Sequence, residues 1–323
     1  MATRVAILDD YQNIALDSAD WKSLPSDVEL VVFNQYIKDE NAVARALADF
    51  DVVVAMRERT PFPASLIEKL PNLKLLVTTG MRNLAIDMDA ARKRGLPVCG
   101  TGLLPYPAFE HTWALILALF KQIPREDRTM HEGGWQSAIS VGLRDKTLGV
   151  VGLGKLGQQV AKIGLAFGMK IIAWSQNLSE ERAKECGAVR VDKNKLFADS
   201  DVVTIHLVLS ERTRGLVGRR ELALMKPSAF LVNTSRGPIV DEAALIDALE
   251  RRAIAGAGID VYNVEPLPSD HPLRKLDNAV LTGHTGYVMR EVYTLAYGEA
   301  VEDIKTWLEG NPVRVLNPDT RSK

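Results

Sequence analysis

The sequence has very little cysteine and no excess of charge of either sign. Only two of its 323 residues are cysteines, and 40 lysines and arginines stand against 41 aspartates and glutamates. Cys99 and Cys186 lie far apart and lack the Cys-x-x-Cys or Cys/His spacing of a zinc site or disulfide framework. Balanced charge argues against a protein that binds nucleic acid or anionic lipid. We therefore expect a small-molecule partner, with no nucleic acid, no membrane and no metal.

Long apolar runs are also lacking. No apolar segment approaches the roughly 20 residues needed to span a bilayer. The chain opens on the strand-like run 4–8 instead of a basic leader followed by an apolar stretch. We expect a cytoplasmic protein from these features. The length and the 46% hydrophobic composition are sufficient for two packed domains.

Short apolar runs alternate with amphipathic segments over the first hundred residues. A helix is expected over 41–50, and another over 88–94 that ends at Gly95. Alternating strands and helices are typical of a parallel sheet covered by helices. The buried strands that the pattern predicts are residues 5–8, 28–33, 52–55, 73–77 and 97–99.

A second alternating series follows a strongly apolar helix predicted over residues 111–120. A long helical pattern over 288–308 then suits a return to the first series, which makes the first domain discontinuous. The strands expected in the second series are residues 148–151, 170–174, 202–207, 229–233, 254–259 and 279–282.

A Gly-x-Gly-x-x-Gly pattern lies between the first strand of the second series and a helix expected over 158–167. Gly152 permits the tight turn, Gly154 lets the backbone approach a pyrophosphate, and Gly157 allows close contact of helix and strand. The helix N-terminus favours an anion. A glycine-rich connection without chemical importance is the alternative. The predicted dinucleotide-binding residues of this loop are Gly152, Leu153, Gly154, Lys155, Leu156 and Gly157.

The strand expected at 170–174 has no acidic residue at its end. Ser175 and Gln176 stand where an Asp or Glu normally binds the ribose hydroxyls of the adenosine. Because a carboxylate is absent at this position, no negative charge there repels the 2′-phosphate of NADP. No arginine stands at the strand end to bind it, the nearest being Arg182 in the following helix. The cofactor is therefore predicted to be NAD or NADP, with the choice open.

Four ordered motifs resemble those of the D-isomer-specific 2-hydroxyacid dehydrogenases, which include phosphoglycerate dehydrogenases and glyoxylate/hydroxypyruvate reductases. The resemblance covers most of the chain and implies a nicotinamide-dependent oxidoreductase that interconverts a small 2-keto acid and its D-2-hydroxy acid. It also implies a homodimer. The motifs are the glycine loop, the segment ELALMKPSAFLVNTSRG that ends at Gly237, the residues 258–261 with 265–267, and the residues 281–284.

The resemblance gives the catalytic roles to Arg236, Glu265 and His284. A guanidinium can hold the substrate carboxylate by paired hydrogen bonds and polarise the carbonyl oxygen. As hydride reaches the carbonyl carbon, histidine can supply the proton that the oxygen needs. Glu265 would orient the imidazole and favour its protonated form, so reduction is expected to be favoured at lower pH. Taken singly, Arg236 could be a surface ion-pair partner and His284 a structural hydrogen-bonding residue.

Further cofactor contacts are expected at neighbouring strand ends. Asp260 resembles the family residue that contacts the nicotinamide carboxamide, although it could as easily cap a loop. Thr234 and His206 resemble cofactor-lining positions. His111, at the start of the apolar helix, is interpreted as structural.

The chain departs from the family pattern where a glycine-rich substrate loop is usual. The corresponding stretch reads TTGMRN over residues 78–83. Backbone N–H groups of Gly80, Met81 and Arg82 could still hold a carboxylate. Arg82 suits either a second acidic group of the substrate or an ion pair at a domain interface. Arg57, at another strand end, is a weaker substrate candidate.

A second departure lies beside His284. Gly283 replaces the usual proline, and Tyr287 stands where the family has a small residue. Tyr287 would narrow the pocket or add a hydroxyl donor, so we expect it to contact the substrate. The substrates of the family therefore do not transfer directly to this chain.

We predict an α/β fold of two doubly wound parallel-sheet domains. A Rossmann domain over residues 103–287 is expected to bind NAD(P), and a discontinuous flavodoxin-like domain over 1–102 and 288–323 to bind substrate. The rival interpretation is a non-catalytic dinucleotide-sensing regulator, because corepressors are known on this scaffold. A formate dehydrogenase of the same superfamily would need Gln in place of Glu265 and is set aside.

Overall fold

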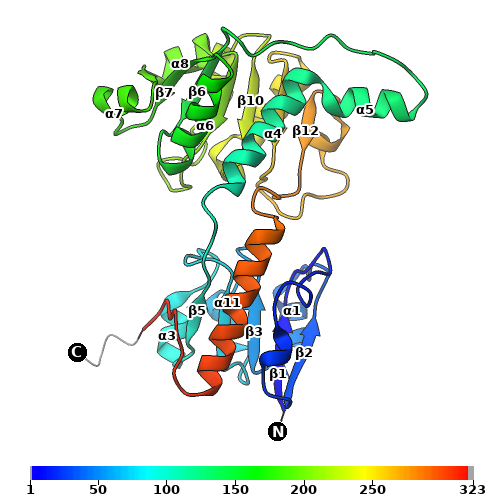
Figure 1. Cartoon of the computed structure of the whole chain (residues 1–323), viewed down its shortest axis with the longest axis vertical. Coiled ribbons are helices and arrows are strands. Elements are labelled where there is room, and N and C mark those ends of the chain that lie inside the picture. Colours follow the sequence, from blue (N-terminus) through cyan, green and yellow to red (C-terminus); the bar gives the residue numbers. More distant parts are fainter. Residues whose placement is uncertain (1, 319–323) are drawn as a thin grey trace. The chain divides into compact units, whose positions relative to one another are not determined.

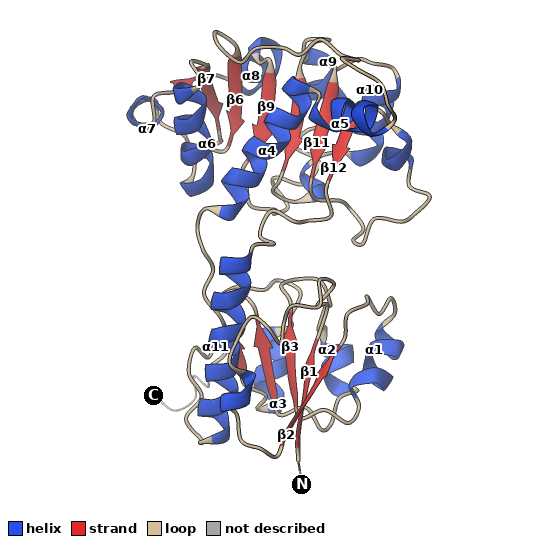
Figure 2. Cartoon of the chain, turned by 45° about the vertical axis from the view of Figure 1, so that its right-hand side comes forward, coloured by secondary structure: helices blue, strands red, loops and turns tan. Residues whose placement is uncertain are grey.

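The computed structural model describes residues 2–318 and divides into two compact units (Figure 1). Unit 1 comprises the chain up to Leu104 together with the chain from Val288 onward, and unit 2 comprises Pro105–Tyr287. Both units hold a parallel sheet with helices packed on it (Figure 2). The predicted fold class is therefore confirmed. Within the described part of the chain, no helix has the length and apolarity required to cross a membrane.

The sheet of unit 1 has the strand order β2-β1-β3-β4-β5, which is the flavodoxin-like order. Strands β3 and β4 are buried along their whole length, as expected for continuous apolar runs in a parallel sheet. Helices α1 (Glu40–Leu47), α2 (Ala64–Glu68), α3 (Met88–Arg94) and α11 (Arg290–Leu308) complete the unit. The strands are β1 (Thr3–Ile7), β2 (Val28–Val32), β3 (Val52–Ala55), β4 (Leu75–Thr78) and β5 (Val98–Gly100).

The segment after α11 pairs with β5. The N–H of Leu316 donates to the carbonyl of Val98 (2.7 Å), and the N–H of Gly100 donates to the carbonyl of Arg314 (3.1 Å). The Arg314 guanidinium also donates to the Asp303 carboxylate on α11 (3.0 Å). The segment thus extends the sheet of unit 1 at its β5 edge and is bound to α11 by charge.

The sheet of unit 2 has the order β12-β11-β10-β9-β6-β7-β8. Counted from β6 as the first strand, this is the Rossmann order 3-2-1-4-5-6 with one further strand added at the edge. The strands are β6 (Thr147–Val151), β7 (Lys170–Trp174), β8 (Val189–Arg190), β9 (Val202–Ile205), β10 (Phe230–Asn233), β11 (Gly256–Ile259) and β12 (Ala279–Leu281).

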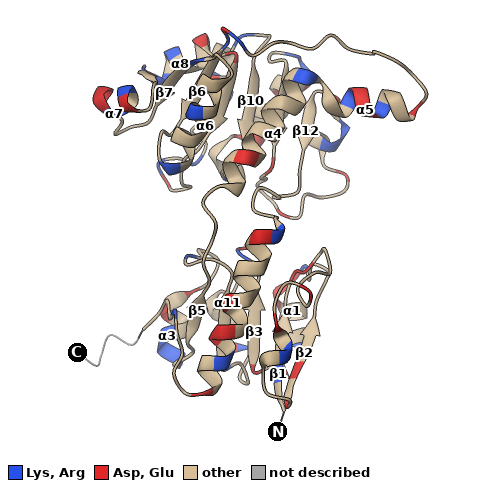
Figure 3. Cartoon of the chain, in the orientation of Figure 1, with Lys and Arg blue, Asp and Glu red and all other residues tan. Residues whose placement is uncertain are grey.

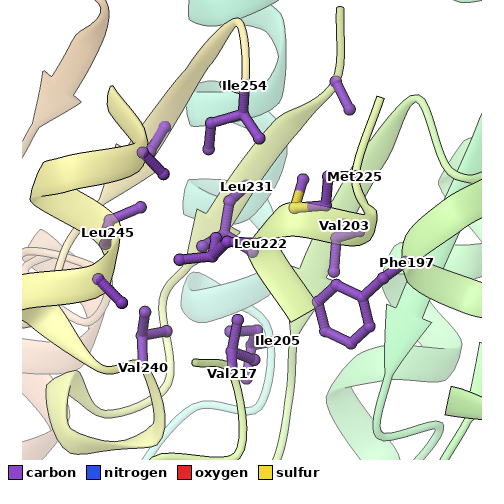
Figure 4. Packing of buried hydrophobic residues seen from close by; sticks show 14 of the residues in the cluster. Phe197, Val203, Ile205, Val217, Leu222, Met225, Leu231, Val240, Leu245 and Ile254 are labelled. Atoms are coloured by element: carbon purple, nitrogen blue, oxygen red, sulfur yellow. The ribbon is translucent and has the colours of Figure 1, made fainter. Parts of the chain in front are cut away.

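Alternating side chains of these strands build one hydrophobic core on each face of the sheet. On β9, Val202 packs with α4 (Pro107–Lys121), α6 (Lys155–Ala166) and α7 (Glu180–Glu185), whereas Val203 packs with the helices of the opposite face. Figure 4 shows this second core, where side chains of α8–α10 meet those of β9 and β10. The helices there are α8 (Lys193–Asp199), α9 (Arg219–Leu224) and α10 (Glu242–Glu250); α5 (Ile123–His131) follows α4.

Helix starts follow local sequence signals. Side-chain oxygens at the N-cap accept the backbone N–H three residues on, which satisfies a donor that the helix itself leaves unpaired. Charged side chains of both signs lie mostly on helices and loops, and the strands carry few (Figure 3). The capping residues of this kind are Asp39, Asp87, Ser179, Asp192 and Asp241.

Every strand predicted from the sequence is present, with ends within two residues of the predicted ones. The two-residue edge strand β8 (Val189–Arg190) was not predicted, since two residues are too few to show alternation. The apolar helix α4 begins at Pro107 instead of residue 111, because a proline is well suited to the first turn of a helix.

We predict that Asp303 makes unit 1 less stable as pH rises. Burial raises the pKa of Asp303 to about 7, although Arg314 lowers it, and its Oδ2 has no hydrogen-bond partner among the described residues. An unfolded aspartate has a pKa of about 3.9, so the folded chain binds the proton more tightly between these pH values. Stability contributed by this proton is present below pH 4 and is lost as pH rises through 7.

Asp303→Asn should therefore reduce the loss of unfolding free energy between pH 5 and pH 8 by about 2 kcal/mol in urea titrations. Asp49→Asn is the matched control, because the side chain of Asp49 is 81% exposed. Equal pH slopes in wild type and Asp303→Asn would contradict the prediction.

Candidate active site

The candidate residues of unit 2 gather at the carboxyl ends of neighbouring parallel strands. Gly152 follows β6, Ser175 follows β7, and His206 follows β9. Asp260 directly follows β11, and His284 lies three residues after β12. Because all seven strands run in the same direction, these ends form one edge of the sheet, which is where ligands bind in open α/β sheets.

The glycine loop forms a close contact between β6 and α6. Gly152 has a φ of +100°, and a Cβ there would lie 2.7 Å from the His206 carbonyl oxygen. A Cβ on Gly157 would lie 2.0 Å from the Gly152 carbonyl oxygen. Both positions therefore require glycine, the first for its conformation and the second for the close approach.

Helix α6 begins at Lys155, not at residue 158 as expected, with Gly154 as its N-cap. The missing side chain at Gly157 lets the first turn lie directly on the loop, which explains the earlier start. Lys155, Leu156 and Gly157 are thus first-turn residues, whose N–H groups have no intrahelical acceptor. An ideal Cβ on Gly154 meets no protein atom within 4 Å. The loop therefore has the open space and donors that a dinucleotide pyrophosphate needs.

The end of β7 offers no charge to the adenosine ribose. Ser175 is half-buried and Gln176 is exposed. Arg182 is engaged by its own neighbourhood, with its guanidinium 3.0 Å from Glu185 and 2.7 Å from the side-chain oxygen of Gln158. These contacts favour neither NAD nor NADP.

Two further cofactor candidates are held by hydroxyl groups. His206 Nε2 lies 2.9 Å from Thr204 Oγ1, and burial lowers the pKa of His206 to about 4, so the ring is neutral at neutral pH. Thr234 Oγ1 lies 2.7 Å from Thr112 Oγ1 on α4. Neither side chain brings a charge to this edge of the sheet at neutral pH.

Glu265 and His284 form a direct pair. His284 Nδ1 lies 2.6 Å from Glu265 Oε2, and the backbone N–H of Tyr262 donates to Glu265 Oε1 (2.9 Å). The imidazole is 25% exposed and its partner 34%, so the pair is accessible to a ligand. Tyr287 stands edge-on to His284, with the ring centroids 5.7 Å apart. With Nδ1 oriented by the carboxylate, Nε2 is the ring atom that could exchange a proton.

Asp260 holds the turn that carries His284. The carboxylate is 1% exposed and accepts the hydroxyl of Thr282 (2.6 Å) and the N–H groups of Thr285 (2.8 Å) and Gly286 (3.0 Å). His111 Nε2 lies 3.2 Å from the same carboxylate. Burial acts to raise the pKa of Asp260, but the contacts with His111, Thr282 and Thr285 outweigh it and lower that pKa.

The sequence allows two interpretations of Asp260, a carboxamide contact and a loop cap. The contacts are those of a loop cap, since the carboxylate oxygens face the turn and His111. His111 has the structural role that the sequence indicated, because its ring joins α4 to Asp260 and Thr282.

Arg236 lies in a turn after β10 that Asn233 closes. The Asn233 side chain accepts the N–H of Ser235 (3.1 Å) and donates to the Arg236 carbonyl (3.1 Å). A Cβ on Gly237 would lie 2.1 Å from the backbone carbon of Tyr262, so the segments after β10 and β11 are in backbone contact. Sequence reasoning missed Asn233, Gly237 and Tyr262. Asn233 and Gly237 lie within the Arg236 motif, and Tyr262 lies between the two parts of the Glu265 motif.

The substrate candidates of unit 1 fall into two groups. The guanidinium of Arg57 lies directly against Gly80, since a Cβ on Gly80 would meet Nη1 at 2.3 Å. Met81 and Arg82 are exposed. The N–H of Gly80 donates to Thr101 Oγ1 (3.1 Å), while the substrate-binding role of Gly80, Met81 and Arg82 stays a prediction. The hydroxyl group was not anticipated because Thr101 comes from the distant β5 end.

Comparison with known proteins identifies the class of this chain. Residues 113–286 match the family model for the NAD binding domain of D-isomer specific 2-hydroxyacid dehydrogenases. The chain belongs to this family, and it is an enzyme of the nicotinamide-dependent 2-hydroxyacid dehydrogenase class. The cofactor is thus a nicotinamide dinucleotide, and unit 2 carries the matched segment.

Particular relatives cover the chain to different extents. A D-3-phosphoglycerate dehydrogenase of Archaeoglobus fulgidus is 39% identical over 84% of this chain, which spans about half (52%) of that relative. A glyoxylate reductase of Aeropyrum pernix is 38% identical over 78% of either chain. The crystal structure of a phosphoglycerate oxidoreductase from Vibrio cholerae matches with a TM-score of 0.90 at 35% identity, covering 95% of this chain and 99% of that one.

Two glycine substitutions should separate cofactor binding from folding. Gly154→Val places a side chain in the open space of the loop and should weaken NAD(H) or NADP(H) binding about tenfold or more, with little change in Tm. Gly157→Ala collides with the Gly152 carbonyl and should lower stability by about 1–3 kcal/mol. Fluorescence titration and thermal unfolding would measure both. Undiminished cofactor affinity in Gly154→Val would rule out this loop as the pyrophosphate site.

Proposed function

We propose that this enzyme reduces small 2-keto acids to D-2-hydroxy acids with NADH or NADPH and also catalyses the reverse reaction. The contact that carries the proposal is the 2.6 Å pair of His284 and Glu265 at the carboxyl edge of the cofactor-binding sheet. The position of Arg236 also supports the proposal. Gly237 lies against the backbone of Tyr262, so the turn that carries Arg236 packs against the segment that leads to Glu265. Carboxylate recognition and proton transfer are thereby assigned to adjoining segments.

The glycine loop from Gly152 to Gly157 would hold the dinucleotide, which when bound would supply the hydride for the substrate carbonyl carbon. The Arg236 guanidinium holds the substrate carboxylate and stabilises the negative charge that develops on the carbonyl oxygen. His284 donates the Nε2 proton to that oxygen, while the Glu265 carboxylate stabilises the imidazolium before transfer. In the oxidative direction His284 accepts the hydroxyl proton instead.

We further propose which residues contact the substrate and which contact the cofactor. The substrate contacts are Gly80, Met81, Arg82 and Arg57 of unit 1 and Tyr287 of unit 2. Thr234 and His206 line the cofactor site together with Ser175, Gln176 and the glycine loop, and Asp260 borders it as the cap of the turn after β12.

The choice between NAD and NADP stays open, and a homodimer and a cytoplasmic location are predictions that follow from sequence and resemblance. The relatives described above are named as a dehydrogenase, a reductase and an oxidoreductase. These names favour the enzyme over the non-catalytic dinucleotide-sensing regulator.

His284→Ala should slow the reduction of keto acids, with kcat about 100-fold to 10,000-fold lower, because a positioned proton donor is lost. Cofactor oxidation with NADH and with NADPH would be followed against glyoxylate, hydroxypyruvate, pyruvate, phenylpyruvate and 2-ketoglutarate. His131→Ala is the control, since His131 lies on α5 and is 82% exposed. Turnover that is equal in wild type and His284→Ala would exclude the assigned proton donor. Cofactor binding without turnover on any keto acid would count against the reductase.

Arg82→Ala should separate singly from doubly acidic substrates. A charge-assisted hydrogen bond contributes about 1.5–3 kcal/mol, so its loss should raise KM for a doubly acidic keto acid at least about tenfold. The KM for pyruvate or glyoxylate should change less than about twofold. Lys93→Ala, an exposed cation on α3, is the control. An equal KM change for both substrate classes would refute the assignment and favour a structural ion pair. Arg57→Ala, measured in parallel, tests the second cation.

A further inference from the structure

Tyr262 joins the carboxyl ends of two neighbouring strands. Its single hydroxyl proton is shared between two carbonyl acceptors, that of Ile259, the last residue of β11 (3.0 Å), and that of Thr282, the first residue after β12 (2.9 Å). The residue is 6% exposed. A single buried donor thus fixes the start of the turn that leads to His284, two residues further on.

The backbone of Tyr262 contacts the other two candidate catalytic segments. Its N–H donates to Glu265 Oε1 (2.9 Å), the oxygen that does not face His284. Its carbonyl carbon lies so close to Gly237 that a Cβ on Gly237 would come within 2.1 Å. Tyr262 is therefore in contact with the segments that carry Arg236, Glu265 and His284.

We propose that Tyr262 is a positioning residue that holds the Glu265–His284 pair in its reactive geometry. The inference rests on the proposed function, in which this pair transfers the proton. Tyr262 acts through the pair and touches neither substrate nor cofactor in this role.

The geometry of His284 shows why such a hold is needed. Its φ of +53° lies in the left-handed region, which costs a non-glycine residue on the order of 1 kcal/mol or more. The turn keeps this conformation only if both of its sides are held. On the far side of His284, the Asp260 carboxylate accepts the N–H groups of Thr285 and Gly286. On the near side, the Tyr262 hydroxyl donates to the carbonyl of Thr282. Removing one side lets the imidazole shift away from Glu265.

The Tyr262 hydroxyl keeps its proton and so acts as a hydrogen-bond donor at every pH of an assay. Burial raises the pKa of Tyr262 well above its ordinary value, and the nearby Asp260 carboxylate raises it further. The phenol therefore stays protonated across the whole pH range of an assay. Phenylalanine keeps the ring and the backbone N–H but removes this donor, so Tyr262→Phe tests the hydroxyl alone.

The kinetic test compares Tyr262→Phe with Tyr297→Phe, which alters another buried tyrosine in unit 1. We expect Tyr262→Phe to lower kcat about threefold to tenfold while cofactor KM changes less than about twofold, because a misplaced imidazole affects the transition state and not cofactor binding. In the Glu265→Gln background the same substitution should have little further effect on kcat, since both act on one pair. The control should leave kcat unchanged.

A second measurement needs no turnover. The chain has five histidines, so proton NMR gives five imidazole Hε1 signals, and the His284 signal is assigned from its loss in His284→Ala. Glu265 contacts the His284 ring directly and Tyr287 stands edge-on to it. In Tyr262→Phe the chemical shift of the His284 signal, measured at one fixed pH, should change, because the ring moves relative to the Glu265 carboxylate and to Tyr287. The other four signals should keep their chemical shifts.

The results separate this inference from the proposed function. An active wild type with unchanged kcat and an unchanged His284 chemical shift in Tyr262→Phe overturns the positioning role and leaves the function intact. An inactive wild type overturns the function, while a change confined to the His284 signal would still support the positioning role. Additive losses in the Glu265→Gln background, or equal shifts in all five signals, show a general structural effect and overturn the inference. Thermal unfolding and cofactor binding verify that each variant is folded.

Discussion

The buried carboxylate of Asp260 holds the turn after β12, and the candidate active site of unit 2 depends on this contact. Asp260 is 1% exposed, and its hydrogen bonds go to Thr282, Thr285 and Gly286. A buried carboxylate is costly unless its oxygens are satisfied. The donors of the turn satisfy the carboxylate oxygens. The same hydrogen bonds keep His284 in a left-handed conformation that few non-glycine residues adopt.

Close backbone contacts extend the same constraint along the sheet edge. Gly237 brings the Arg236 turn against Tyr262, and Gly157 brings α6 against Gly152. At both places a single methyl group would force two segments apart. In the proposed mechanism, proton transfer, carboxylate recognition and cofactor binding thus depend on positions that carry no reactive group themselves. A rigid edge of this kind supplies the preorganisation that hydride transfer requires.

Much of the fold followed from local patterns. Continuous apolar runs predicted the strands because a strand buried on both faces has no polar alternation, and the glycine spacing predicted the loop after β6. The local patterns failed where distant residues decide the outcome. The N–H of Gly80 donates to Thr101, which directly follows β5, and the Asp260 carboxylate after β11 accepts N–H groups of the turn after β12. No window of adjacent residues contains such contacts.

The sequence by itself determined the doubly wound class, the glycine loop, and which residue types stand in the Arg236, Glu265 and His284 motifs. These features depend on short-range periodicity and on spacing within one segment. Only the tertiary structure decided that Glu265 Oε2 meets His284 Nδ1, that Asp260 faces the turn, and that Tyr262 bridges β11 and β12. The strand order and register of the folded sheet bring these groups together, and both are set by packing between residues far apart in the chain.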